Sequence, residues 1–419
     1  MTTLDPGPPP DGGYGWVCAA AAATINMHSW GFNSAYAVFL AHYLSTNAFP
    51  GSTPLEYAFV GGLSLTCLFL ISPVATYLLR RIGVRSTMML GVVLEAASFV
   101  GASFATRISH LFVTQGLIFG MGLGLLFIPT AAVVPQWFAT KRSLASGVSL
   151  AGAGLGGGVY SLSAAAMIRN LGLAWAFRIL AIIGFVINTL CVALIRDRYK
   201  GVKSSRSVMD IRLLRKPEYA LLIGFSGFTM LGYFILIFTL ANFANTIGLN
   251  SAQAATISAV FNFAQSVGRP LVGYFSDSYG RINIACSMTL LAGVLSLAVW
   301  IPSKTYGLTL FFAISSGLVA GNFWATIAPL MSEILDLEEA PAGLSLLWFT
   351  MAVPSTFSEP IASQIFKVTG SYLGTEVFTG VMYIAAAGCL GILKVLVAKR
   401  HSPASTLSPK GASRGWKRN

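Results

Sequence analysis

The chain has 419 residues, of which 55% are hydrophobic and only 10% are charged. Soluble domains carry about 25% charged residues, so this composition, with a mean hydropathy of +0.72, excludes an ordinary soluble domain and indicates a lipid-bilayer protein. The net charge of +13 does not indicate a nucleic-acid partner. The basic residues lie between apolar runs, where they orient a membrane protein.

Twelve apolar runs follow one another along the chain. The first six cover about 14–43, 56–79, 86–105, 109–136, 143–168 and 173–195, and the second six cover about 218–245, 251–275, 282–301, 305–331, 340–366 and 371–397. Each is long enough for a membrane-spanning helix, which needs about 20 mostly apolar residues. We therefore expect an all-α integral membrane protein with 12 transmembrane helices in two six-helix pseudo-symmetric halves, residues 14–195 and 218–397.

The distribution of Lys and Arg predicts the orientation of these helices. Most of the 27 Lys and Arg residues fall on the side that holds both chain ends, including a basic loop at 196–217 and a basic tail at 398–419. The opposite side holds Arg107, Arg169, Lys304 and Lys367. By the positive-inside rule, the tail and a disordered leader at 1–13 are expected in the cytoplasm.

Three residues near the end of the second run recur near the end of the eighth, all at the same offset. The matched pairs are Pro73 and Pro270, Tyr77 and Tyr274, and Gly83 and Gly280. A parallel repeat of two six-helix halves produces such an echo.

The segment from Gly273 to Arg281 has the composition of a gate. Gly273 permits close helix approach, Gly280 permits a tight turn, and Asp277 at the membrane edge can pair with a helix end or with Arg281. The plain alternative is a turn with a solvated Asp. This segment resembles the inner-loop signature of the major facilitator superfamily, whereas the first half has Arg80 in place of the Asp.

Two further motifs resemble the signatures of the monocarboxylate transporter (MCT) family within that superfamily. They are the stretch from Asp11 to Trp16, with Tyr14 where many members have Trp, and the stretch from Trp137 to Gly147. The stretch from Trp30 to Phe39 is similar to the fungal branch. The resemblance implies a secondary active transporter of small organic anions, monocarboxylate-like, that works by alternating access as a plasma-membrane monomer, with or without proton coupling.

Polar residues within the predicted spans indicate the substrate path, because a charge in lipid is costly. Asn262, Gln265 and Arg269 share one face of the eighth helix. A guanidinium can hold a carboxylate with two parallel hydrogen bonds, and the resemblance places the family's functional arginine at Arg269. The alternative is an arginine that extends to the membrane surface.

The chain departs from the animal members of the family at two positions. It has Gln265 where many of them have Asp, and Asn33 and Ser34 where they have Lys. The resemblance links those residues to proton-coupled uptake of monocarboxylates. Efflux of a larger, weakly polar metabolite is therefore the alternative function.

Other ionisable and polar residues lie in the spans. Asn26 and Asn33 form part of a polar stripe on the first helix, and we include Glu359, which precedes Pro360, among the coupling candidates. An internal ion pair that involves Glu95, Arg178 or Glu359 is the plain interpretation. If a proton carrier exists, Glu359 or Glu95 is a better candidate than His28, which is expected to be structural.

Small and aromatic residues have simpler roles. Six glycines between Gly147 and Gly158 are expected to provide close helix packing, and Tyr14 and Trp16 are expected to anchor the membrane interface.

Two other classes of protein are disfavoured. A membrane enzyme needs convergent catalytic groups, but the four histidines are far apart, and no metal or cofactor pattern is present. A non-transporting nutrient sensor usually needs a signalling extension, and the leader and tail are short.

Overall fold

The computed structural model describes residues 9–198, 208–336 and 339–401. Residues 1–8, 199–207 and 402–419, which belong to the predicted leader, basic loop and basic tail, lie outside the described residues. Within the described ranges the regular structure is helical throughout. The chain is therefore all-α, as its composition predicts.

The first half contains six spans in chain order. They are α1 (Tyr14–Thr46), α2 (Pro54–Leu70) with α3 (Ser72–Ile82), α4 (Val84–Ala102), α5 (Ile108–Leu111) with η1 (Phe112–Ile118), α6 (Phe119–Val133) and η2 (Val134–Trp137), α7 (Arg142–Leu171), and α8 (Leu173–Leu194). The second span bends by 44° between α2 and α3.

The second half follows a short helix, η3 (Ile211–Arg215), and also contains six spans. They are α9 (Pro217–Thr246), α10 (Ser251–Tyr279), α11 (Arg281–Leu295) with η4 (Ser296–Trp300), α12 (Tyr306–Ala320) with α13 (Asn322–Ile334), α14 (Ala340–Thr369), and α15 (Leu373–His401). The expectation of twelve helices in two halves is confirmed.

Length and apolarity separate these spans into two groups. Among the described residues, eight helical stretches are long and apolar enough to cross a membrane, and the bent pair α2 and α3 makes a ninth. The other three, α1, α10 and α14, have 33, 29 and 30 residues and are long enough. They carry most of the predicted site residues, which makes them less apolar.

The two halves repeat the same packing. In the first half α1 packs on α7 and α8, α4 packs on α6 and α8, and α2 packs on α6. The equivalent helices of the second half make the same contacts, since α9 packs on α14 and α15, α11 packs on α12 and α15, and α10 packs on α12. Gly83 and Gly280, at the matched turns, have φ angles of 82° and 94°. A positive φ favours glycine, which explains why this pair recurs.

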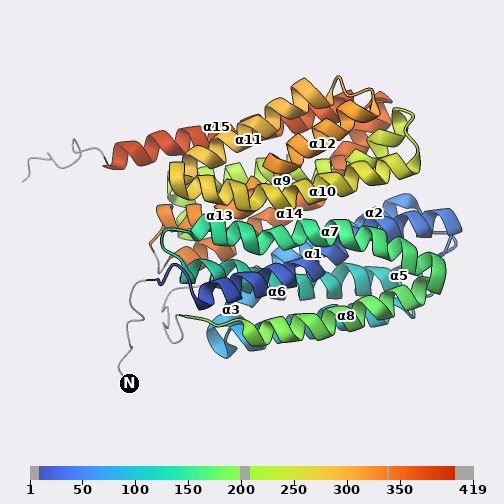
Figure 1. Ribbon diagram of the computed structural model, residues 1–419, viewed down its shortest axis with the longest axis horizontal. Helices are drawn as coiled ribbons and strands as arrows, with labels where there is room; N and C mark the ends of the chain where they lie inside the picture. Colours follow the sequence, from blue (N-terminus) through green and yellow to red (C-terminus); the bar gives the residue numbers. More distant parts are fainter. Residues whose placement is uncertain (1–8, 199–207, 337–338, 402–419) are drawn as a thin grey trace, which may run out of the picture.

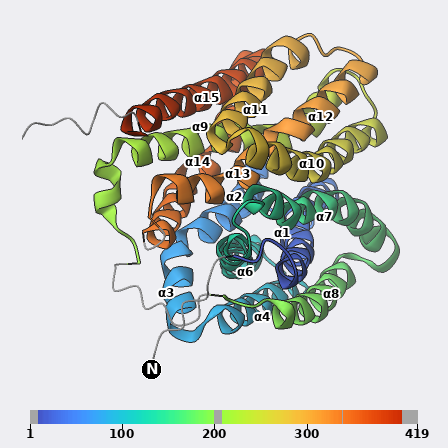
Figure 2. The ribbon, with the colours of Figure 1, turned by 60° about the vertical axis from the view of Figure 1, so that its left-hand side comes forward.

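The halves meet along two symmetry-related helix pairs, α7 with α10 and α2 with α14. Figure 1 shows the blue-to-green helices of the first half below the yellow-to-red helices of the second, with α7 and α10 adjacent. Figure 2 shows the same division after rotation. The end of the bundle at which α1 begins and α15 ends is called the terminal end below.

Candidate functional site

Arg269 of α10 lies at the contact between the two halves. Its side chain is buried, with a residue exposure of 5%. Nη1 donates to the carbonyl oxygen of Leu150 in α7 at 2.5 Å, and Nη2 donates to Tyr233 Oη and Gln265 Oε1, both at 2.8 Å. The guanidinium is thus held by one group of the first half and two groups of the second, and it does not extend to the membrane surface.

The charge of Arg269 has no carboxylate partner among the described residues. Its Nε has no hydrogen-bond partner there. A buried cation without a counterion is unfavourable, and a buried N–H without an acceptor adds to that penalty. The arrangement can therefore bind an anion.

Two other predicted residues of α10 lie beside Arg269. Gln265 is 1% exposed, and its Oε1 accepts a hydrogen bond from Tyr233 Oη at 2.7 Å. Its Nε2 lies 3.5 Å from Asn262 Oδ1, while Asn262 Nδ2 donates to the carbonyl oxygen of Ser258. The predicted face of the eighth helix is therefore continuous, and Tyr233 of α9 bonds to two of its residues, Gln265 and Arg269.

The asparagines of α1 have partners in their own half. Asn26 Nδ2 donates to the carbonyl oxygen of Ser149 in α7 at 3.0 Å. Asn33 Nδ2 donates to Ser64 Oγ in α2 at 3.0 Å. Neither bonds to Arg269, so both hold α1 in place within the first half.

The expected ion pair among Glu95, Arg178 and Glu359 is not found in the described ranges. The Arg178 guanidinium lies over the rings of Phe104 and Trp175, at 5.0 and 5.2 Å. Its charge is stabilised by aromatic faces rather than by a carboxylate.

Glu359 and His28 have separate environments. Glu359 lies close enough to Tyr36 of α1 for an electrostatic interaction across the two halves. The His28 ring bonds to the carbonyl oxygen of Thr24 at 2.8 Å and packs against Phe32 and Tyr160. This is the structural role expected for His28.

An aromatic cluster closes the centre of the molecule beside Arg269. It contains Trp30 of α1, Phe127 of α6, Trp324 of α13 and Trp348 of α14. Trp30 lies 5.4 Å from Trp324, and Phe127 lies 5.3 Å from Trp348.

Asp277 caps a helix of the other half at the terminal end. Its carboxylate accepts hydrogen bonds from the backbone N–H groups of Ser143 and Leu144, at 3.1 and 2.9 Å. These groups begin α7, where the helix dipole favours a negative charge. An added Cβ at Gly273 would meet the carbonyl group of Ser143, so glycine permits this close approach.

Arg281 holds Asp277 in position. Its Nε lies 3.4 Å from Asp277 Oδ1, and its Nη1 lies 3.2 Å from Glu333 Oε1 in α13. Arg142 of α7 adds a hydrogen bond to Ser332 Oγ at 3.3 Å. The halves are thus joined here by polar contacts, from Asp277 to the start of α7 and from Arg142 to Ser332.

The two motifs at the start of α1 and α7 pack on each other. Asp11 Oδ1 accepts hydrogen bonds from the N–H groups of Ala139 and Thr140, at 2.6 and 2.9 Å. The Tyr14 ring lies 5.8 Å from Trp137, and the Trp16 ring lies 4.9 Å from Phe138. Both aromatic residues therefore hold this end of the first half together, beyond the anchoring role expected for them.

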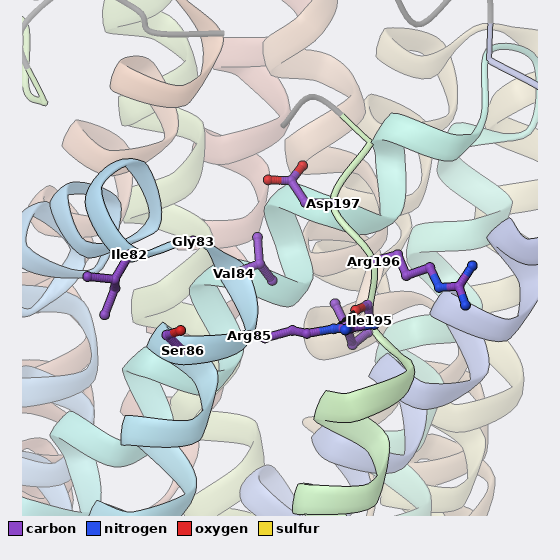
Figure 3. A pocket seen from close by; sticks show the side chains of 8 residues that line it. All are labelled: Ile82, Gly83, Val84, Arg85, Ser86, Ile195, Arg196 and Asp197. Atoms are coloured by element: carbon purple, nitrogen blue, oxygen red, sulfur yellow. Dashed lines mark hydrogen bonds between the residues drawn. The ribbon is translucent and has the colours of Figure 1, made fainter. Parts of the chain in front are cut away.

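An open pocket lies at the terminal end between the start of α4 and the end of α8. Figure 3 shows the residues that line it: Ile82, Gly83, Val84, Arg85, Ser86, Ile195, Arg196 and Asp197. Arg85 Nε donates to the carbonyl oxygen of Ile195 at 2.8 Å, and the Arg196 guanidinium lies over the Tyr14 ring at 4.1 Å. Both cations are engaged, and no predicted site residue lines this pocket.

Known structures share this architecture. The fold matches the E. coli fucose:proton symporter FucP with a TM-score of 0.69 and 14% identity, over 93% of this chain and 99% of that one. It matches the proton:xylose symporter XylE with a TM-score of 0.70 and 14% identity, over 92% of this chain and 95% of that one. At this identity the likeness shows the fold alone.

Sequence relatives extend the comparison. The chain is 33% identical over 399 residues to the "Probable transporter MCH2" of Saccharomyces cerevisiae, over 93% of this chain and 84% of that protein. It is 26% identical over 410 residues to the "Fujikurins efflux protein" of Gibberella fujikuroi, over 94% of this chain and 86% of that protein. Residues 18–240 and 222–418 match the family model of the Major Facilitator Superfamily. This chain is therefore a multi-pass membrane transporter that belongs to the Major Facilitator Superfamily, and it is not an enzyme.

Proposed function

We propose that this transporter carries small organic anions of the monocarboxylate type, and that it belongs to the fungal branch of the MCT family. In this proposal it works as a monomer in the plasma membrane, with both termini in the cytoplasm. The substrate binds at Arg269 between the halves, and the halves rock about that point.

The observation that carries this proposal is the buried guanidinium of Arg269, which has no carboxylate partner among the described residues. A carboxylate substrate would supply the missing charge and an acceptor for the free Nε. Tyr233 and Gln265 already orient the guanidinium through two hydrogen bonds, so little ordering is needed when the substrate binds.

The bond from Arg269 to Leu150 suggests how binding leads to movement. Nη1 donates to a backbone carbonyl of the first half, so the guanidinium joins α10 to α7. An anion that takes over this donor removes one link between the halves. Binding would therefore favour the state in which the contact of α7 with α10 is opened, as alternating access requires.

Transport into proteoliposomes tests the proposal. A panel of radiolabelled monocarboxylates is offered to wild-type protein, Arg269→Ala and Arg269→Lys, each with and without an inward proton gradient. A charge-assisted hydrogen bond contributes about 1.5–3 kcal/mol, so Arg269→Ala should reduce uptake at least tenfold. Arg269→Lys keeps the positive charge but loses the two parallel N–H donors of the guanidinium. It should therefore retain only part of the wild-type uptake.

The same uptake measurement distinguishes anion transport from the alternative function, efflux of a weakly polar metabolite. If well-folded wild-type protein takes up none of the acids, the monocarboxylate proposal fails. Efflux of a weakly polar metabolite then becomes the better candidate. Two observations favour it: the central aromatic cluster, and the similarity to a relative that is named for efflux. The efflux function would be supported if Trp324→Ala no longer transports a hydrophobic substrate while Arg269→Ala still does.

A further inference from the structure

Glu95 is a buried carboxyl group that the proposed function does not use. It lies in α4 with a residue exposure of 2%. Its Oε2 accepts hydrogen bonds from Asn188 Nδ2 of α8 at 2.9 Å and from Ser29 Oγ of α1 at 3.3 Å. Three helices of the first half therefore meet at this one side chain.

Two oxygen atoms at this site have no donor. Glu95 Oε1 and Asn188 Oδ1 are both buried and lack a hydrogen-bond partner among the described residues. Only one of the two carboxyl oxygens of Glu95 therefore has a donor. An ionised carboxylate can only accept hydrogen bonds, so a buried unpaired oxygen disfavours the ionised form. A proton on Oε1 removes that penalty and makes the oxygen a donor.

The surrounding helices supply no compensating charge. The titratable group that interacts electrostatically with Glu95 is Tyr160 of α7, and no cation among the described residues does so. His28 bonds to its own helix, and the described side chains of α6 include no titratable group. Arg178 lies near the start of α8, where its guanidinium packs on Phe104 and Trp175. An ionised Glu95 would thus be buried without a cation, which is strongly unfavourable.

The position of Glu95 connects it to the centre of the transporter. Its partner Ser29 directly precedes Trp30, which contacts Trp324 of the second half. On the other side, Gly122 of α6 packs against the backbone of Glu95. A change of charge at Glu95 therefore acts on α1 next to the residue that closes the centre.

We propose that Glu95 is a proton-binding site of this transporter, occupied in the present conformation and emptied when the two halves move apart beside Trp30. The inference rests on the proposed function for its role in transport, but not for the existence of the bound proton. The exchange is a simple acid–base step. The carboxylate takes a proton from hydronium, which leaves water, and later returns the proton to water when the halves separate and water reaches the site.

Infrared spectroscopy of the purified full-length protein in lipid tests for the proton without a substrate. A protonated buried carboxyl group gives a C=O band that is separate from the carboxylate bands. We expect such a band at neutral pH in wild-type protein and its loss in Glu95→Gln. The matched control is Glu376→Gln, which alters another buried carboxyl group, 4% exposed, in the second half. An unchanged band in Glu95→Gln would overturn the proposal.

A second variant keeps this test informative if Glu95→Gln does not fold. Ser29→Ala removes one hydrogen bond to the carboxyl group and should shift the same band. A band that is identical in wild-type protein and Ser29→Ala would belong to another group, which would also overturn the assignment.

Transport measurements then test coupling. Glu95→Gln mimics the protonated acid, so it should retain substrate exchange across equal concentrations but lose the stimulation by a proton gradient. If the infrared band is lost while gradient stimulation persists, Glu95 is a structural acid and the coupling role is wrong. If no substrate is found, the proposed function fails, yet the infrared result still decides whether Glu95 holds a proton.

Discussion

Asp11 and Asp277 bind the same short stretch of chain from two different parts of the molecule. Asp11 accepts from the N–H groups of Ala139 and Thr140, and Asp277 accepts from those of Ser143 and Leu144. One carboxylate precedes the first span, and the other belongs to the second half. The start of α7 is therefore bound within its own half by Asp11 and to the other half by Asp277.

Asp277→Asn should weaken the closure of the terminal end. The charge of Asp277 at a partly buried helix N-terminus contributes about 1–2 kcal/mol, and about 1.4 kcal/mol changes an equilibrium tenfold. We expect a water-soluble maleimide to label Ser146→Cys, in a cysteine-free background, about five- to thirtyfold faster in the variant. Ser146 is 5% exposed and lines the narrow gap between the halves.

Ser278→Ala provides the control for this measurement. It changes the neighbouring residue, whose hydroxyl group bonds only to its own helix at Tyr274. Labelling of Ser146→Cys should be unaffected. Equal labelling rates in Asp277→Asn and wild-type protein would mean that the cap does not hold the halves together.

Asp11→Asn should change stability in a pH-dependent way. Burial acts to raise the pKa of Asp11, but hydrogen bonds from the backbone of Thr140 and Ala139 outweigh it, so the pKa lies below its ordinary value. A carboxylate with a lowered pKa stabilises the folded state above the pKa of the unfolded chain, about 3.9, and loses that effect as pH falls through the folded value.

Thermal unfolding followed by tryptophan fluorescence measures this effect. At neutral pH, wild-type protein should unfold at a higher temperature than Asp11→Asn. The difference should shrink below about pH 4, where the carboxyl group becomes protonated. A difference that stays constant down to the lowest pH at which the protein folds would show that the charge of Asp11 is not the stabilising feature.

The architecture could be predicted from the sequence for physical reasons. Apolar runs of fixed length and the bias of Lys and Arg are imposed by the bilayer, and the recurrence of Gly83 and Gly280 reflects a turn that needs a positive φ. The shared face of Gln265 and Arg269 follows from helical periodicity alone.

The central cluster and the partners of α1 could not be predicted in this way. In a bilayer, both the lipid-facing and the inward-facing sides of a helix are apolar, so periodicity does not show that Trp30 and Trp348 point to the centre. Asn26 and Asn33 fall on a polar stripe, but their partners Ser149 and Ser64 lie on other helices. Such pairings depend on helix rotation, which a single sequence does not specify.

Gln265→Glu should block the anion site with a carboxylate of the protein itself. Gln265 Oε1 lies 2.8 Å from Arg269 Nη2, so the isosteric glutamate would place a carboxylate against the guanidinium. The charge that we assign to substrate binding would then be neutralised by the protein itself. Without a proton gradient we expect at least tenfold weaker uptake of small acids, together with a higher unfolding temperature, because the buried cation gains a partner.

Uptake and unfolding of Gln265→Glu are measured on the same preparation. Gln253→Glu serves as the control, because Gln253 bonds to the exposed start of the same helix at Asn250. That variant should leave uptake unchanged. If Gln265→Glu transports anions as well as wild-type protein, Arg269 does not supply the charge that binds them.

Glycines at two helix contacts should respond differently to the addition of a methyl group. An added Cβ at Gly152 would meet the backbone of Ala23 in α1, within the first half, whereas one at Gly273 would meet the backbone of Ser143, in the other half. Overpacking of this kind costs about 1–3 kcal/mol. Gly391→Ala is the matched control, because nothing lies within 4 Å of an added Cβ there.

The location of each contact determines the expected outcome. Gly152→Ala strains a contact that persists in every state, so it should lower the unfolding temperature without changing the labelling of Ser146→Cys. Gly273→Ala strains a contact that exists only when the terminal end is closed, so the protein can relieve the strain by opening. It should therefore raise the labelling rate with a smaller effect on unfolding. The reverse pattern would mean that α7 and α10 stay together throughout the transport cycle, which is incompatible with rocking of the two halves.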